Sequence, residues 1–218
     1  MVERRSRREL KREEVLLAAT TLAQRKGMDF TMRELADALH TWPNALYRFF
    51  GTKQALQADI IDRVMSAALT DRVLRRLQDD SVPWQTRVQE ICGVIFDVSA
   101  EVPGLGRLLT QESMFESPGL LSLVFTIVEE LAGLGFSRQR AGELVQIVAF
   151  YVLNMGELEA AQRAGRTTEG EFKEVQSAAG AVRGDHAIDA LLSYDKRERM
   201  LSGLALFIAA AERELAER

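Results

Sequence analysis

The chain has 218 residues, of which 47% are hydrophobic and 28% charged, and it contains 15 glycines, 4 prolines and 1 cysteine. This composition is typical of a folded globular protein and excludes a disordered, collagen-like or disulfide-stabilised chain. The formal net charge is -4, but residues 1–53 carry 11 Lys and Arg against 7 Asp and Glu, whereas the rest carries 17 against 25. A basic segment on an acidic body suits a protein that presents one face to a polyanion, although an ordinary solvated face gives the same pattern.

Other features bear on compartment and cofactors. Cys92 has no second cysteine to pair with, and with His40 and His186 far apart in sequence it cannot complete a zinc site without carboxylates. The longest apolar run, residues 203–211, is much shorter than the roughly 20 residues of a membrane-spanning helix. The charged N-terminus does not read as a signal peptide. We therefore expect a cytoplasmic protein without metal, cofactor or membrane segment.

The first 53 residues carry the signals of three helices. Thr31 followed by Glu34 has the spacing of a capping box, Gly27 predicts the end of the first helix, and Pro43 suits the first turn of the third. The second and third helices are short and joined by a three-residue turn. This is the helix-turn-helix arrangement, whose last helix enters the DNA major groove.

Helical periodicity continues to the end of the chain, so we predict an all-α fold with domains at 1–53 and 54–218. One long helix is predicted from Thr52 to about Leu77. Further helices are expected at residues 85–100, 105–109, 120–134, 144–158 and 200–215, with a loop at residues 164–185.

Two of these helices, at residues 144–158 and 200–215, are apolar almost all round. A helix that is hydrophobic on every side must be covered on every side, and a second copy of the chain is the expected cover. This pattern predicts a homodimer with a four-helix interface. The alternative is a monomer in which both helices lie at the centre of the bundle.

Four segments together resemble the DNA-binding domain of the TetR family of bacterial transcriptional regulators: V-L-L-A-A at 15–19, T-M-R-E-L-A at 31–36, A-L-Y-R-F-F at 45–50 and K-Q-A-L at 53–56. The C-terminal part is similar, more weakly, to the ligand-binding domain of the tetracycline-repressor branch, notably L-G-F-S at 134–137, Gly156 with Glu157, and L-S-G-L at 201–204. The resemblance implies a helix-turn-helix DNA-binding domain followed by an effector-binding and dimerisation domain.

The resemblance also implies which residues contact DNA. Thr31 and Arg33 would meet phosphate or a base edge, the recognition helix would read base edges, and Arg48 and Lys53 would anchor the backbone. The arginine-rich segment at residues 4–12 would enter the minor groove or track phosphates. The alternative is that Tyr47 is a packed aromatic and Arg33 an ordinary surface charge. The recognition helix is framed by Thr41, Trp42, Pro43, Asn44, Ala45 and Tyr47.

Two positions depart from the family pattern. His40 stands where the turn usually has Gly, so we expect this residue at positive φ. Trp42 replaces the usual small residue before the recognition helix, which leaves open whether Thr41 or Trp42 caps it and whether Trp42 stacks on DNA or packs on the domain.

Family members of this type bind a small molecule in the second domain, which weakens DNA binding by linkage. The expected pocket residues are Phe96, Leu109, Met114, Phe115, Phe125, Phe150, Asn154 and Glu157, with Trp84 at the rim. Each is otherwise plain core, except that Asn154 and Glu157 are polar within an apolar helix and need a hydrogen-bond partner. We expect an apolar effector.

An enzyme is not expected, because the chain has no phosphate-binding glycine loop, metal-spaced histidine pair or nucleophile triad. The sequence predicts a homodimeric repressor that binds a near-palindromic operator in double-stranded DNA and is released by a small-molecule effector. The alternative is a dimeric helical adaptor that binds a small molecule or a protein without specific DNA binding.

Overall fold

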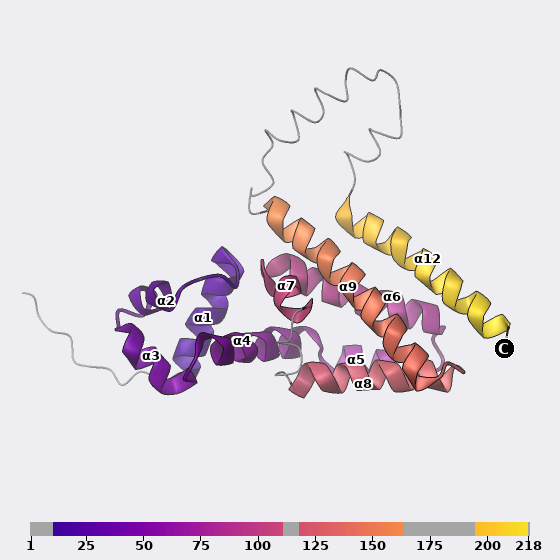
Figure 1. Cartoon of the computed structure of the whole chain (residues 1–218), viewed down its shortest axis with the longest axis horizontal. Helices are drawn as coiled ribbons and strands as arrows, with labels where there is room; N and C mark the ends of the chain where they lie inside the picture. The colour runs from indigo at the N-terminus through magenta and orange to yellow at the C-terminus, as the bar shows by residue number, and fades with distance from the viewer. Residues whose placement is uncertain (1–10, 111–117, 164–194, 218) are drawn as a thin grey trace, which may run out of the picture.

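The computed structural model describes residues 11–110, 118–163 and 195–217, and every regular element within these ranges is a helix, as predicted. The loop expected at residues 164–185 lies outside them. The helices, labelled in Figure 1, are α1 (Arg12–Lys26), α2 (Met32–Ala38), α3 (Pro43–Phe50), α4 (Lys53–Ala68), α5 (Asp71–Leu77), α6 (Trp84–Glu101), α7 (Leu105–Thr110), α8 (Pro118–Gly133), α9 (Arg138–Arg163) and α12 (Lys196–Ala216).

Helices α1, α2 and α3, with the first part of α4, form a small head at one end of the molecule (Figure 1). α1 packs on α4 and α2, and α3 packs on α2 and α4. Buried apolar side chains recur three or four residues apart on these helices, as amphipathic helices require. The interior of the head includes Val15, Ala19, Leu35, Leu46, Phe50, Leu56 and Ile60.

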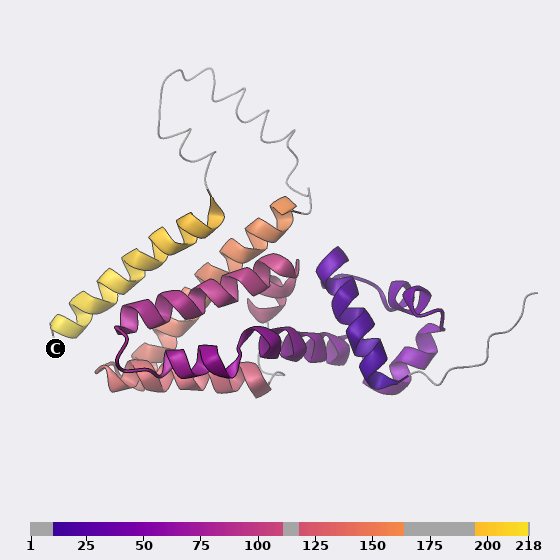
Figure 2. The ribbon, with the colours of Figure 1, turned by 180° about the vertical axis from the view of Figure 1, so that it is seen from behind.

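The other helices form a larger body in which α9 packs against α6, α7, α8 and α12 (Figures 1 and 2). Two glycines allow helices of the body to approach each other closely. A Cβ atom on Gly106 of α7 would lie 2.7 Å from the carbonyl oxygen of Leu153, and one on Gly156 of α9 would lie 2.9 Å from that of Phe96. Because both obstacles are backbone atoms, a larger residue would force the helices apart.

The predicted continuous helix from Thr52 to about Leu77 is wrong. α4 ends at Ala68, because Leu69 leaves the helical region with ψ 62°, and α5 begins only after an extended Thr70. The break turns the chain so that α5 packs on α6 and buries Leu77. Neither Leu69 nor Thr70 is a strong helix breaker, so tertiary packing sets this boundary.

The head and the body share α4. This helix packs on α1 and α3 in the head and on α6 and α8 in the body, and one apolar core runs from Val15 in α1 to Ile208 in α12. The domain boundary predicted between residues 53 and 54 falls at the first turn of this shared helix. A movement of the body would therefore reach the head through a continuous element.

One described helix, α9, is long and apolar enough by length and composition to cross a membrane, and 28% of its most apolar 18-residue stretch is buried. The sequence predicted no spanning segment. In the fold α9 packs on four other helices, and its exposed large apolar residues, Ile147, Phe150 and Leu158, follow one side of it. An apolar stripe on an otherwise packed helix is what a protein interface leaves on a single subunit.

Candidate nucleic-acid interface

The predicted capping box at the start of α2 is confirmed. The Thr31 hydroxyl accepts a hydrogen bond from Glu34 N at 3.1 Å, and Thr31 N donates to the Glu34 carboxylate at 2.7 Å. Lys26 Nζ pairs with the same carboxylate at 2.7 Å. The hydrogen bond from Lys26, followed by those from Thr31, lowers the pKa of Glu34 to about 2. The cap fixes the first turn of α2, from which Arg33 projects into solvent.

The turn between α2 and α3 has the predicted geometry. His40 has φ 52°, the left-handed conformation that the family pattern implies at this position. Thr41 N donates to Ala36 O at 2.9 Å, which holds the turn against α2. The N-cap of α3 is Trp42, in an extended conformation and without a side-chain cap, and Pro43 stands in the first turn.

Helix α3 has a buried side and an exposed side. Leu46 and Phe50 are buried in the head, whereas Trp42 is 81% exposed and Tyr47 42% exposed. Tyr47 is therefore not a core aromatic, and Trp42 does not pack back on the domain. Asn44 and Arg48 are exposed beside them, and Thr41, Pro43 and Ala45 are half-buried at the margin of this surface.

The basic residues of the head differ in the contacts that they make within the protein. Within the described part of the chain, Arg33 and Arg48 form no ion pair. Lys53 Nζ lies 5.5 Å from the centre of the Phe30 ring. Arg12 pairs with Asp59 and lies 4.9 Å from the centre of the Phe50 ring. The Arg12 side chain is thus held by contacts within the head. The arginines before it lie outside the described residues.

We call the exposed surface formed by Arg33, Trp42, Asn44, Tyr47 and Arg48 the reading surface. It contains two arginines without an ion pair to any described residue, an amide that can pair with a base edge, and two aromatic side chains. No acidic residue lies in α3. The donors and positive charges suit the phosphates and base edges of a DNA major groove.

The described residues among those expected to line an effector pocket differ in burial. Phe96 and Leu109 are buried, but Phe125 is 65% and Phe150 42% exposed. The two polar residues both have partners: exposed Asn154 donates to Phe150 O at 2.7 Å, and half-buried Glu157 accepts from Gly104 N at 2.8 Å and 3.0 Å. Met114 and Phe115 lie outside the described residues.

An apolar cavity of about 90 Å³ lies elsewhere, between α6, α8, α9 and α12. Of the described residues predicted for the pocket, only Trp84 lines it. The sequence gives no signal for the others, because each is an ordinary apolar residue at a helix position facing the core. They include Val88, Ile91, Cys92, Ile127, Val148, Val152, Leu204 and Phe207. Burial raises the pKa of the Cys92 thiol to about 12, so this wall of the cavity is uncharged.

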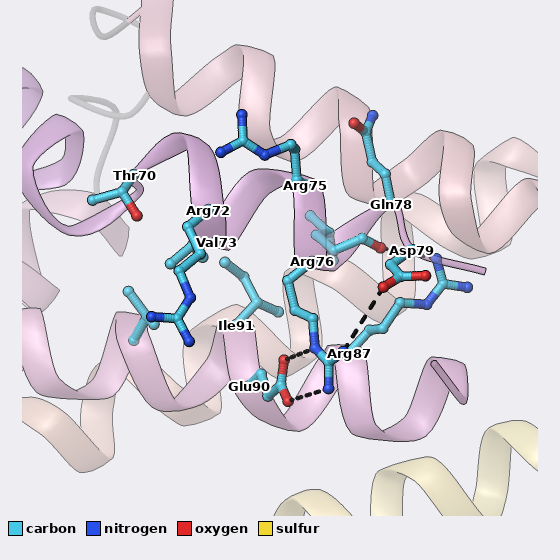
Figure 3. Close-up of a pocket in the computed structure, with 12 residues that line it drawn as sticks. Thr70, Arg72, Val73, Arg75, Arg76, Gln78, Asp79, Arg87, Glu90 and Ile91 are labelled. Atoms are coloured by element: carbon cyan, nitrogen blue, oxygen red, sulfur yellow. Dashed lines mark hydrogen bonds and ion pairs between the residues drawn. The ribbon is translucent and has the colours of Figure 1, made fainter. Parts of the chain in front are cut away.

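A polar groove lies between α5 and α6 (Figure 3). Arg76 makes a two-point contact with the Glu90 carboxylate at 3.0 Å and 3.3 Å. Buried Arg87 donates to Leu77 O and to Glu130, each at 2.8 Å. These contacts tie α5 to α6 and α8. Among the described residues no group of three or more His, Cys, Asp or Glu side chains could hold a metal ion.

Residues 15–60 match the family model described as bacterial regulatory proteins, tetR family. A curated relative, the nucleoid occlusion factor SlmA of Mannheimia succiniciproducens, is 30% identical over 132 residues, and the match spans 60% of each chain.

Two solved structures share the fold. BioQ with its natural double-stranded DNA operator has a TM-score of 0.59 and 26% identity, covering 72% of this chain and 92% of BioQ. A single-substitution variant of TetR from Acinetobacter baumannii, in complex with minocycline, has a TM-score of 0.63 and 24% identity, covering 94% of this chain and 98% of that variant. The family model spans α2 and α3 entirely, so it includes the whole reading surface. The head, at residues 15–60, matches the tetR family of bacterial regulatory proteins and is a helix-turn-helix DNA-binding domain.

Proposed function

We propose that the chain is a cytoplasmic, homodimeric transcriptional repressor that binds a near-palindromic operator and is released by an apolar small molecule. The observation that carries this proposal is the reading surface, where exposed aromatic, amide and arginine side chains project from a helix-turn-helix. The family consists of non-enzymatic DNA-binding regulators. The adaptor alternative would leave this surface without a ligand.

Each residue of the interface has a proposed role. Asn44 pairs with an adenine edge, and Pro43 and Ala45 touch thymine methyl groups. Tyr47 and Arg48 donate to phosphates. Thr31, Arg33, Thr41, Trp42 and Lys53 complete the contact with the DNA backbone, with the exposed face of Trp42 stacking on sugar and phosphate.

The homodimer would form through α9 and α12, at residues 144–158 and 200–215. The exposed Ile147, Phe150 and Leu158 of α9 lie on the same side of that helix, and Leu206 of α12 is 75% exposed. Leaving four large apolar side chains in water is unfavourable, and covering them with the same surface of a second copy removes that cost. The two reading surfaces would then be one helical turn of DNA apart, roughly 34–36 Å.

The effector site would be the apolar cavity. Its lining offers no charged group, and its volume of about 90 Å³ is below the roughly 300 Å³ of ordinary ligand pockets. An effector larger than the cavity would have to displace α12 or α9 from α6. Since α9 and α12 form the proposed dimer interface, such displacement would change how the two heads are spaced.

The test is selection of bound duplexes from a random DNA pool at two salt concentrations, because phosphate contacts make affinity salt-dependent. We expect an enriched palindrome. Arg48→Ala should reduce the salt slope by about 1, whereas Asn44→Ala should relax sequence choice at one position in each half-site. Arg72→Ala is the matched control, since Arg72 is also an exposed arginine but lies in the α5–α6 groove. Equal effects of Arg48→Ala and Arg72→Ala, or no enriched sequence, would refute the proposal.

The effector site is tested separately with 1-decanol as an apolar probe. It should raise the melting temperature of the wild-type protein and weaken its binding to the selected duplex. Val148→Trp, which fills the cavity, should abolish both effects, whereas Leu121→Trp on the far side of α8 should not. Retention of both effects in Val148→Trp would place the site elsewhere.

A further inference from the structure

The peptide group between Pro103 and Gly104 joins the body to the head. Its carbonyl oxygen accepts a hydrogen bond from Met28 N at 2.7 Å, and its N–H donates to the Glu157 carboxylate at 2.8 Å and 3.0 Å. The oxygen and the hydrogen belong to one planar unit, so they cannot move independently. Met28 lies between α1 and α2 in the head, and Glu157 lies on α9 in the body.

The head side of this connection is firmly held. Met28 has no exposed surface, and its carbonyl oxygen accepts a hydrogen bond from Gln57 Nε2 of α4 at 3.0 Å. The next residue, Asp29, pairs with Arg107 of α7 at 2.6 Å. One contact therefore joins the α1–α2 turn to the α6–α7 turn, one joins it to α7, and one joins it to the shared helix α4.

The body side depends on Glu157 and on a glycine. Gly104 has φ 85°, a backbone conformation that favours glycine, whereas an added Cβ would meet the Met28 Cβ at an ordinary van der Waals distance of 3.4 Å. A carboxylate that accepts from a backbone N–H makes a stronger hydrogen bond than a neutral acceptor. Glu157 is next to Leu158, which belongs to the apolar stripe of α9, and one turn from the exposed Asn154.

We infer that Glu157 is a positioning residue that transmits the position of α9 to the DNA-binding head through the Pro103–Gly104 peptide. When α9 shifts or turns, the Glu157 carboxylate turns this peptide, and the peptide oxygen moves the α1–α2 turn at Met28. The reading surface follows, because α2 starts at Met32, four residues later. This route is separate from α4. The inference rests on the proposed function, in which α9 forms the dimer interface and the head binds operator DNA.

The first test is amide hydrogen exchange of the full chain, with the Met28 amide measured relative to the amides of α3. Glu157→Ala should speed exchange at Met28 about tenfold, the size expected for losing a charge-assisted hydrogen bond. Glu157→Gln keeps an acceptor and should restore most of the protection. Glu159→Ala is the matched control, because Glu159 lies on the same helix but pairs with Arg163 at the surface. Leu204→Ala controls for general destabilisation, since Leu204 is fully buried on α12 in the lining of the apolar cavity.

Unchanged relative exchange at Met28 in Glu157→Ala, or an equal increase in Leu204→Ala, would overturn the inference. If Glu157→Ala does not fold, Gln57→Leu tests the connection from the head. It should speed exchange at the Gly104 amide, and an unchanged rate there would also overturn the inference.

The second test uses the duplex selected above. Operator binding should change exchange in residues 150–160 of wild-type α9 about fivefold, because coupling between two sites is reciprocal. Glu157→Ala should abolish this distant response and keep the protection of α3 by DNA. A response that persists in Glu157→Ala would overturn the inference. If no duplex binds, the proposed function fails, while the exchange at Met28 still decides whether the connection exists.

Discussion

The head and the body are each held together by a different kind of contact. In the head, the deciding hydrogen bonds join residues three apart, as between Thr31 and Glu34 at 3.1 Å and between Thr52 and Ala55 at 3.0 Å. In the body, α6 meets α9 at Gly156, and Arg140 pairs with Glu214, 74 residues away, at 3.0 Å. Local sequence therefore controls the geometry of the reading surface, whereas the spacing between helices controls the geometry of the body.

The largest expected effect is a loss of stability caused by a substitution in the body. Gly156→Leu should lower the free energy of unfolding by about 3 kcal/mol, because its Cβ would collide with Ser99 Cβ at 2.5 Å and with Phe96 O at 2.9 Å. Urea unfolding measures this. Gly142→Ala on the same helix is the control: its Cβ meets nothing within 4 Å, so stability should rise by about 0.5 kcal/mol. A urea midpoint unchanged by Gly156→Leu would contradict the close approach.

A smaller effect is expected from loss of the α2 cap. Thr31→Ala should cost about 1 kcal/mol of stability, because Glu34 N loses its acceptor. Thr31→Ser keeps the hydroxyl and should retain most of it. Thermal melts of the three proteins measure the difference, and an equal loss in the serine variant would mean that the methyl group, not the cap, matters.

Smaller still is the effect expected from Arg12→Ala. The variant loses the ion pair with Asp59 and the contact with the Phe50 ring, worth about 0.5 kcal/mol for a guanidinium that is 55% exposed. Affinity for the selected duplex should stay within about twofold, since Arg12 faces α4. Arg25→Ala, an exposed arginine of the same helix, should change neither quantity. Loss of operator affinity without loss of stability in Arg12→Ala would show instead that Arg12 contacts DNA together with the rest of the arginine-rich segment at residues 4–12.

The smallest effect is the pH dependence of the cap. The pKa of Glu34 is lowered in the folded state to about 2 from 4.5, so its contribution is present above pH 4.5 and is lost as the pH falls towards 2. Urea midpoints of wild type and Glu34→Gln at pH 6, 4 and 3 should therefore converge in acid. A constant difference between the two proteins would show that the carboxylate charge contributes nothing.

Most of the head could be predicted from sequence, because its signals are local. The capping box at Thr31 and the position of Pro43 each depend on a few neighbouring residues, whereas the positive φ of His40 is expected from the resemblance to the family. The apolar periods of α6, α8, α9 and α12 likewise predicted these helices to within a few residues at most ends.

The body could be predicted only as a set of helices. The break at Leu69 depends on how α5 packs on α6, and no local residue marks it. The apolar cavity missed by the sequence is lined by side chains such as Val88 and Leu204 that look like any core residue. The partner of Glu157 is a backbone amide 53 residues away, which side-chain identity does not reveal.

The glycines along α9 have a consequence for how such a regulator can be retargeted. Gly106 and Gly156 meet backbone atoms, and a Cβ on Gly203 of α12 would collide with the Tyr151 hydroxyl, so these three positions set the spacing of the helices. The cavity walls are built instead from interchangeable aliphatic side chains. Libraries that vary Val88, Val148 and Leu204 while retaining the three glycines should change which effector the proposed site binds, without changing the spacing of the heads in the proposed dimer.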